Sequence, residues 1–168
     1  MRALDYERTL PSGGTARELA LAFDRDRDKR LLIIPALFDE ANRMRRFTVE
    51  VMRRLDGAGI DCFLPDLPGC NESLQDLALQ TSVDWSDAML SAAGHFNVTH
   101  VLAIRGGGLI MPRNLPGWHY GAVKGASILR HMLRARIISS REAGRKESQE
   151  QLIEAGLEGG LELSGFPR

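Results

Sequence analysis

Short apolar runs alternate with amphipathic stretches along the middle of the chain, and this alternation constrains the fold most strongly. The apolar runs lie at 31–35, 60–64 and 98–104, and each ends at a proline or runs into glycines. Such runs are typical of buried strands, whereas the stretches at 41–56 and 82–95 have helical spacing. We therefore predict adjacent, parallel strands with the two helices on opposite faces, an α/β three-layer sandwich with a mostly parallel sheet.

The two amphipathic stretches carry recognisable end signals. Gly57 and Gly59 end the first stretch, whose apolar face consists of Met44, Phe47, Val51, Met52 and Leu55. Ser82 is the candidate N-cap of the second stretch, with Asp84 in its first turn. These signals predict helices that each bury one face.

Elements outside this central region are less regular. Residues 1–17 begin with a polar segment, whereas 18–23 alternate as a half-exposed strand does. Residues 118–123 are compatible with a fourth central strand, and 126–138 and 141–156 are predicted helices. With 168 residues, the chain fits a single domain spanning 1–168, in which 126–168 form a helical, cap-like segment.

Composition excludes several function classes. Basic and acidic residues balance at 22 each, so no net field recruits nucleic acid or an anionic membrane. The apolar stretches are too short to span a membrane, and the N-terminus lacks the apolar core of a signal peptide, so we expect a cytoplasmic protein. Cys62 and Cys70 could form one disulfide, although free thiols fit a reducing compartment better. We expect neither a metal site nor a cofactor, since no Cys/His set has ligand spacing.

Arg105 and the glycines 106–108 stand where the third apolar run ends. In α/β folds, ligands bind just beyond the carboxyl ends of the strands, and glycine there allows a close approach of ligand or backbone. The triplet lacks the Lys-Ser/Thr of a P-loop and the spacing of a dinucleotide fingerprint. The position indicates a binding site other than a nucleotide site.

These residues resemble the α/β-hydrolases. The turn is similar to their nucleophile elbow, G-x-S-x-G, with Ala103 for the first glycine and Arg105 for the serine. The sequence 66–73 is similar to the D-x-x-G-x-G-x-S loop of that superfamily, with Asn71 for the second glycine. The segment 38–46 resembles the exosortase A system-associated hydrolases of bacterial exopolysaccharide systems, whose second type also carries Arg at the nucleophile position.

The resemblance implies a hydrolase-like fold without the usual serine chemistry. Hydrolases supply their acid and histidine after the nucleophile, and only His119 and His131 follow Arg105 before the chain ends at Arg168. We therefore expect a C-terminally short form with a degenerate elbow and no catalytic residue. Ser73 is structural in the family, and Cys70 fits a packing thiol better than a reactive one.

The expected function is non-catalytic binding of a small ligand. The candidate site consists of the strand end and the loop after the first central strand, namely Arg105, Gly106, Gly107, Phe38, Glu40, Asn42 and Arg45. Guanidinium and backbone N–H groups suit an anionic, acyl or saccharide ligand, such as a carboxylate or phosphate of a polysaccharide precursor. Alternatively, Arg105 pairs internally with Asp39, Glu40 or Asp66 and holds no ligand.

Two further functions remain open at this stage. One is an active esterase-type or acyl-transfer hydrolase with an unrecognised nucleophile. The other is an accessory protein of an export or assembly complex, as a homodimer. Charges between 130 and 146 are mostly basic and those from 147 to 162 are acidic, which fits a partner surface as well as intramolecular pairing. The charged block 24–30 likewise fits either a recognition patch or, better, a solvated loop.

Overall fold

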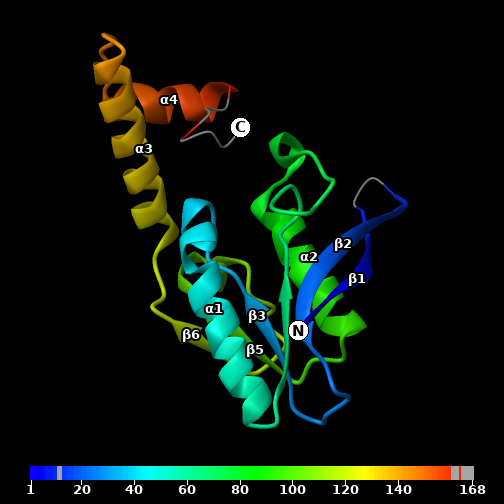
Figure 1. Cartoon of the computed structure of the whole chain (residues 1–168). Helices are drawn as coiled ribbons and strands as arrows, with labels where there is room; N and C mark the ends of the chain where they lie inside the picture. The colour runs from blue at the N-terminus through cyan, green and yellow to red at the C-terminus, as the bar shows by residue number, and fades with distance from the viewer. Residues whose placement is uncertain (11–12, 160–162, 164–168) are drawn as a thin grey trace.

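One mixed sheet forms the centre of the molecule in the computed structural model, which describes residues 1–10, 13–159 and 163 (Figure 1). Its strands lie in the order β1-β2-β4-β3-β5-β6. Their bounds are β1 Arg2–Thr9, β2 Thr15–Phe23, β3 Arg30–Ile34, β4 Asp61–Pro65, β5 His100–Ile104 and β6 Gly117–Tyr120. The antiparallel hairpin β1–β2 joins β4 at one side, and β4, β3, β5 and β6 run parallel.

The predicted centre of the sheet is confirmed. In the register of the parallel strands, Leu32 of β3 lies beside Phe63 of β4 and Val101 of β5. All three side chains are fully buried. Strands buried on both faces read as continuous apolar runs, which is why these were recognisable in the sequence.

Helices α1 (Asp39–Gly57) and α2 (Ser82–His95) cover opposite faces, as predicted (Figure 1). Met52 of α1 belongs to the core cluster that contains Ile33, whereas Met89 of α2 belongs to the cluster that contains Leu32. Successive side chains of a strand point to opposite faces. Leu32 and Ile33, which are neighbours on β3, therefore belong to the cores under α2 and α1, respectively.

The N-terminal segment is a strand, so the prediction of a merely polar segment there is wrong. The inward row of β1 includes Tyr6 and Arg8, and Glu18 stands opposite Tyr6 on β2. Arg8 and Glu18 are buried as an ion pair with side chains 1% and 0% exposed. Buried charges break the alternation of apolar and polar residues on which strand prediction depends.

Three predicted boundaries need correction. Thr81, rather than Ser82, is the N-cap of α2, because its hydroxyl accepts from Asp84 N while Asp84 accepts from Thr81 N. The strand expected at 118–123 is β6 and ends earlier, before Gly121, which has φ +56°. The strand expected at 18–23 is β2, which begins earlier, at the end of the hairpin turn.

The helix predicted at 141–156 is wrong in its first half. Helix α3 (Gly125–Glu142) runs past the expected end at 138, and α4 (Gln149–Gly159) starts later. Gly144, with φ +74°, follows the end of α3, a conformation that glycine adopts readily at helix ends. Residues 160–162 and 164–168 of the predicted cap-like segment lie outside the described residues.

Arginines of the charged block 24–30 form ion pairs with Asp61 at the start of β4. Arg27 Nη1 contacts Asp61 Oδ1 at 3.2 Å, and Arg30 Nη1 contacts Asp61 Oδ2 at 3.2 Å. Asp61 is fully buried and also accepts the backbone N–H of Arg25 and Arg27. The block therefore anchors the ends of β3 and β4, which the solvated-loop interpretation did not include.

Candidate functional site

Strand β5 ends in a tight turn whose first residue is Arg105, with φ +53°. This backbone region is unusual for a residue with a side chain, and the five-residue 3₁₀ helix η2 (Arg105–Leu109) follows directly. A Cβ atom on Gly107 would lie 2.4 Å from the carbonyl oxygen of Pro35. A Cβ on Gly106 would lie 2.9 Å from Ile128 Cδ1. Gly107 is therefore required by its close approach to backbone, whereas a side chain at Gly106 would have to displace the end of the Ile128 side chain.

A second strained residue, Phe38, stands at the neighbouring strand end. It follows β3, has φ +59°, and occupies the N-cap position of α1 without a side-chain hydrogen bond to the cap. Its ring packs against Trp85 with 5.6 Å between centroids. Two non-glycine residues with positive φ thus lie at the carboxyl ends of adjacent parallel strands, where functional strain is often stored.

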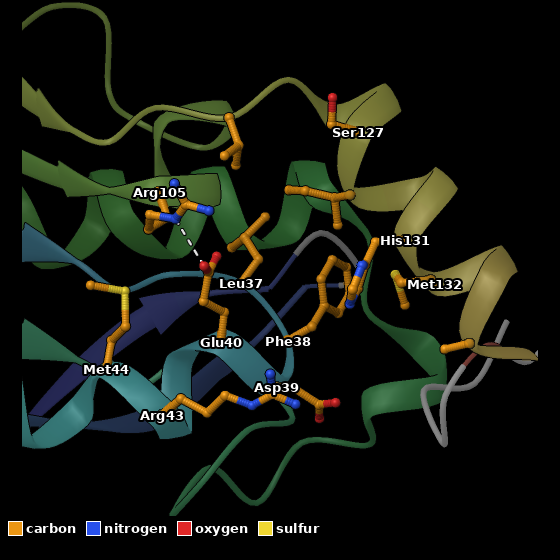
Figure 2. Close-up of a pocket in the computed structure, with 13 residues that line it drawn as sticks. Leu37, Phe38, Asp39, Glu40, Arg43, Met44, Arg105, Ser127, His131 and Met132 are labelled. Carbon is orange, nitrogen blue, oxygen red and sulfur yellow. Dashed lines mark hydrogen bonds and ion pairs between the residues drawn. The ribbon is translucent and has the colours of Figure 1, made fainter.

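Arg105 pairs with Glu40, the second residue of α1 (Figure 2). Its Nε donates to Glu40 Oε1 at 2.8 Å, and its Nη1 donates to the carbonyl oxygen of Gly121 at 3.0 Å. The side chains of Arg105 and Glu40 are each 36% exposed. Of the three acidic partners left open by the sequence, the structure selects Glu40.

A cavity of about 560 Å³ lies beside this ion pair. Leu37, Phe38 and Met44 form its apolar wall on the β3–α1 side, and helix α3 closes it from outside with Ile128 and Met132 (Figure 2). Ser127 and His131 project from the same face of α3. The remaining lining residues are Asp39, Glu40, Arg43, Arg105, Val123 and Ala135. The cavity offers one apolar wall and a charged end.

The two other predicted loop residues, Asn42 and Arg45, do not line the large cavity. Asn42 lines a smaller cavity of about 160 Å³ together with Phe38, which borders both cavities. Arg45 Nη1 donates to Asp66 Oδ1 at 3.0 Å, and Asp66 also accepts from Asn71 Nδ2. Arg45 therefore ties α1 to the loop after β4, while Phe38, Glu40 and Arg105 meet at the large cavity.

Ser73 and Cys70 occupy structural positions in the loop after β4. Ser73 Oγ accepts the N–H of Gly69 at 3.0 Å and that of Gln75 at 3.3 Å. Burial raises the pKa of Cys70 to about 11 and that of Cys62 to about 12, and both cysteines are free. Because the thiolate is the nucleophile, neither thiol is activated at neutral pH.

The contribution of α3 to the cavity was not predicted from the sequence. Residues 126–138 were predicted as a helix, but the pattern did not indicate which part of the molecule that helix packs against. Ser127 and His131 are one helical turn apart, which places them on the same face. Their spacing is the only sequence signal that could have paired them.

Two findings concern other site types. Within the described residues, no group of three or more His, Cys, Asp or Glu side chains is arranged to hold a metal ion. No described helix is long and apolar enough to cross a membrane.

Comparison with known proteins identifies the fold of the chain. No family model and no curated protein matches the chain. Among solved structures, the alpha/beta hydrolase GrgF from Penicillium aligns with a TM-score of 0.55 at 15% identity, covering 88% of this chain and 57% of GrgF. The chain has the α/β-hydrolase fold. Mouse alpha/beta hydrolase domain-containing protein 10 aligns with a TM-score of 0.50 at 14% identity, over 81% of this chain and 46% of the mouse protein.

Members of this fold perform more than one kind of reaction. The Bottromycin epimerase BotH, solved with Bottromycin A2, aligns with a TM-score of 0.56 at 12% identity, over 80% of this chain and 56% of BotH. The chain spans about half the length of such α/β-hydrolase-fold structures. At these identities the likeness concerns the fold alone, because function depends on the site.

Proposed function

We propose that this α/β-hydrolase-fold protein binds a small anionic ligand in the cavity beside Arg105 without cleaving it. The observation that supports the proposal is that Arg105, at the serine position of the elbow-like sequence, has positive φ at the end of β5 and lines the cavity. Serine-hydrolase chemistry needs a nucleophile held against a base. A guanidinium stays protonated and offers only donors, so it can hold an anion but cannot attack a carbonyl.

The ion pair with Glu40 positions Arg105 and is compatible with ligand binding. Glu40 and Gly121 take only part of the guanidinium's N–H donors, and the side chain is about one-third exposed. A carboxylate or phosphate could accept from the remaining donors, and its bidentate geometry would suit the guanidinium. Gly106 and Gly107 follow Arg105 directly but are buried and do not line the cavity, so the proposal assigns the anion to the guanidinium.

The apolar wall suits the remainder of the ligand, an acyl chain or the apolar face of a sugar. Leu37, Ile128 and Met132 line the same cavity as the Arg105–Glu40 ion pair. In this proposal the segment 126–168 acts as a cap over the ligand. The resemblance of segment 38–46 to exosortase-associated hydrolases supports an accessory role in an exopolysaccharide system, in the cytoplasm.

An active esterase or acyl-transfer enzyme is the second candidate. One observation favours it: Ser127 and His131 line the cavity one helical turn apart, so a hydroxyl and a possible base share the site. In the structure, Ser127 Oγ accepts from Arg130 Nη2 at 3.3 Å, which holds the hydroxyl in a different contact. The binding proposal therefore explains the site better.

A thermal-shift experiment with phosphate, acetate and glucuronate tests the binding proposal. At an anion concentration of about 100 times Kd, binding adds about 2.7 kcal/mol, which raises Tm by about 5–10 °C in a chain of this size. We expect Arg105→Ala to abolish this rise, whereas the control Arg46→Ala on the exposed side of α1 should keep it. Equal rises in both variants would contradict anion binding by Arg105.

A fluorophosphonate probe and a p-nitrophenyl ester assay test the enzymatic alternative. Binding without catalysis predicts neither labelling nor turnover in the wild-type protein. Stoichiometric labelling of Ser127, lost together with turnover in Ser127→Ala, would overturn the proposal in favour of the hydrolase.

A further inference from the structure

Helices α3 and α4 present an outer surface that nothing described in the chain covers. They stand beyond the sheet, with α4 lying across the end of α3 (Figure 1). Leu133 and Leu152 are buried on their inner sides. In contrast, Ile138 and Leu157 are 60% and 84% exposed on their outer sides. Such exposed apolar residues gathered on neighbouring helices are typical of protein–protein contact sites.

One exposed side of α3 carries a basic stripe with an apolar residue within it. Arg130, Arg134, Ile138 and Arg141 follow one another at spacings of four, four and three residues. Residues three and four apart lie on the same face of a helix, so these side chains form a single row. We call this row the basic stripe; all of its members are exposed.

The outer face of α4 is the opposite in charge. Glu150, Glu154, Leu157 and Glu158 also recur at helical spacing and are all exposed, and we call this row the acidic stripe. Its ends are about 12 Å apart, and those of the basic stripe about 16 Å, from a rise of about 1.5 Å per residue. The two stripes are therefore opposite in charge, and each carries one exposed apolar residue.

The acidic stripe is not used to neutralise the basic stripe within the molecule. Helix α3 and the start of α4 are joined by a different pair, in which Arg136 Nε donates to Glu147 Oε2 at 3.0 Å. Among the described residues, no ion pair involves a member of either stripe. Both stripes are thus available to a partner, which resolves the charge asymmetry that the sequence left open.

We propose that a second copy of this chain is that partner. In a two-fold dimer, the basic stripe of each copy would lie on the acidic stripe of the other, with Ile138 against Leu157 at the centre. A two-fold interface is self-complementary, so every favourable contact occurs twice. One copy carries both stripes, on two consecutive helices, so each copy can supply both halves of such an interface.

A charge-swap experiment, followed by sedimentation velocity at low salt, tests the dimer. Variant A carries Arg134→Glu with Arg141→Glu, and variant B carries Glu154→Arg with Glu158→Arg. Each variant alone would place like charges opposite one another twice, so self-association should weaken at least about tenfold. Mixed in equal amounts, A and B should form a heterodimer, because the two changed stripes then face each other with opposite charges, and so do the two unchanged stripes.

Matched controls separate the interface from general charge effects. Arg46→Glu with Arg54→Glu reverses two exposed charges on α1 and should leave the dimer intact, while circular dichroism confirms that every variant is folded. Leu157→Ser should weaken the dimer at all salt concentrations. A monomeric wild-type protein at about 50 μM in low salt, where charge attraction is least screened, would overturn the proposal. Failure of A and B to associate when mixed would also overturn it.

Discussion

Glu18→Leu should destabilise the protein strongly, whereas adding Arg8→Met to it should restore stability. Arg8 Nε donates to Glu18 Oε1 at 3.3 Å across the β1–β2 hairpin, and neither side chain is more than 1% exposed. The single replacement leaves a buried guanidinium without its counter-charge. The double replacement removes both charges and fills the site with side chains of similar size.

The magnitude follows from the burial of the pair. Breaking a buried ion pair on one side costs about 3–5 kcal/mol, while replacing both members with apolar residues is about neutral or stabilising. In the described residues, Tyr6 Oη, Arg8 Nη1 and Glu18 Oε2 have no hydrogen-bond partner. The double variant therefore loses few hydrogen bonds and removes two of these unsatisfied polar atoms. For a chain of this size, the single variant should lower Tm by about 6–20 °C.

Urea and thermal unfolding, followed by circular dichroism, measure the difference. Glu7→Leu is the matched control, because Glu7 lies on the exposed face of the same strand and should change stability by less than about 0.5 kcal/mol. The reasoning is refuted if the single variant loses less than about 1 kcal/mol, or if the double variant is as unstable as the single one.

Two further predictions concern α2 and the α3–α4 connection. Thr81→Ala should cost about 1 kcal/mol in chemical denaturation and Ser82→Ala much less, because Thr81 is the N-cap; equal costs would contradict the capping box. Hydrogen bonds from Arg136 and Ser140 lower the pKa of Glu147 from 4.5 to about 2, so its contribution is complete above pH 4.5 and is lost as the pH falls toward 2. As the pH falls through that window, the protection of α4 amides against hydrogen exchange, corrected for intrinsic rates, should fall in the wild-type protein. In Arg136→Met this protection should already be low at neutral pH. Similar pH profiles of protection in the two proteins would refute this role.

The sequence predicts the centre of the sheet well because its pattern there is local. Strands β3, β4 and β5 are buried on both faces, and a proline or glycine turn ends each run. The hairpin was not predictable in the same way. Arg8 looks like a surface residue until its ion pair with Glu18 is known, and this partner lies on the neighbouring strand, diagonally across the pairing register.

The candidate site was predicted in part for a similar reason. Arg105 and Phe38 follow recognisable strands, so their position at the strand ends could be inferred from the order of elements. The choice of Glu40 as the partner of Arg105 depends on how the first turn of α1 meets the strand end. The contributions of Ser127 and His131 depend on where α3 docks, and no strand register fixes that position.

The positive φ values of Phe38 and Arg105 have a physical explanation in the turns after β3 and β5. Phe38 and Arg105 hold positive φ values of 59° and 53°, a strain that persists only where the surroundings determine the backbone. The close approach of Gly107 to the carbonyl of Pro35 provides this constraint, because it locks one turn against the other. This packing fixes the backbone from which the Arg105 side chain reaches the cavity. An arginine held there presents hydrogen-bond donors to the cavity, as the proposed function requires.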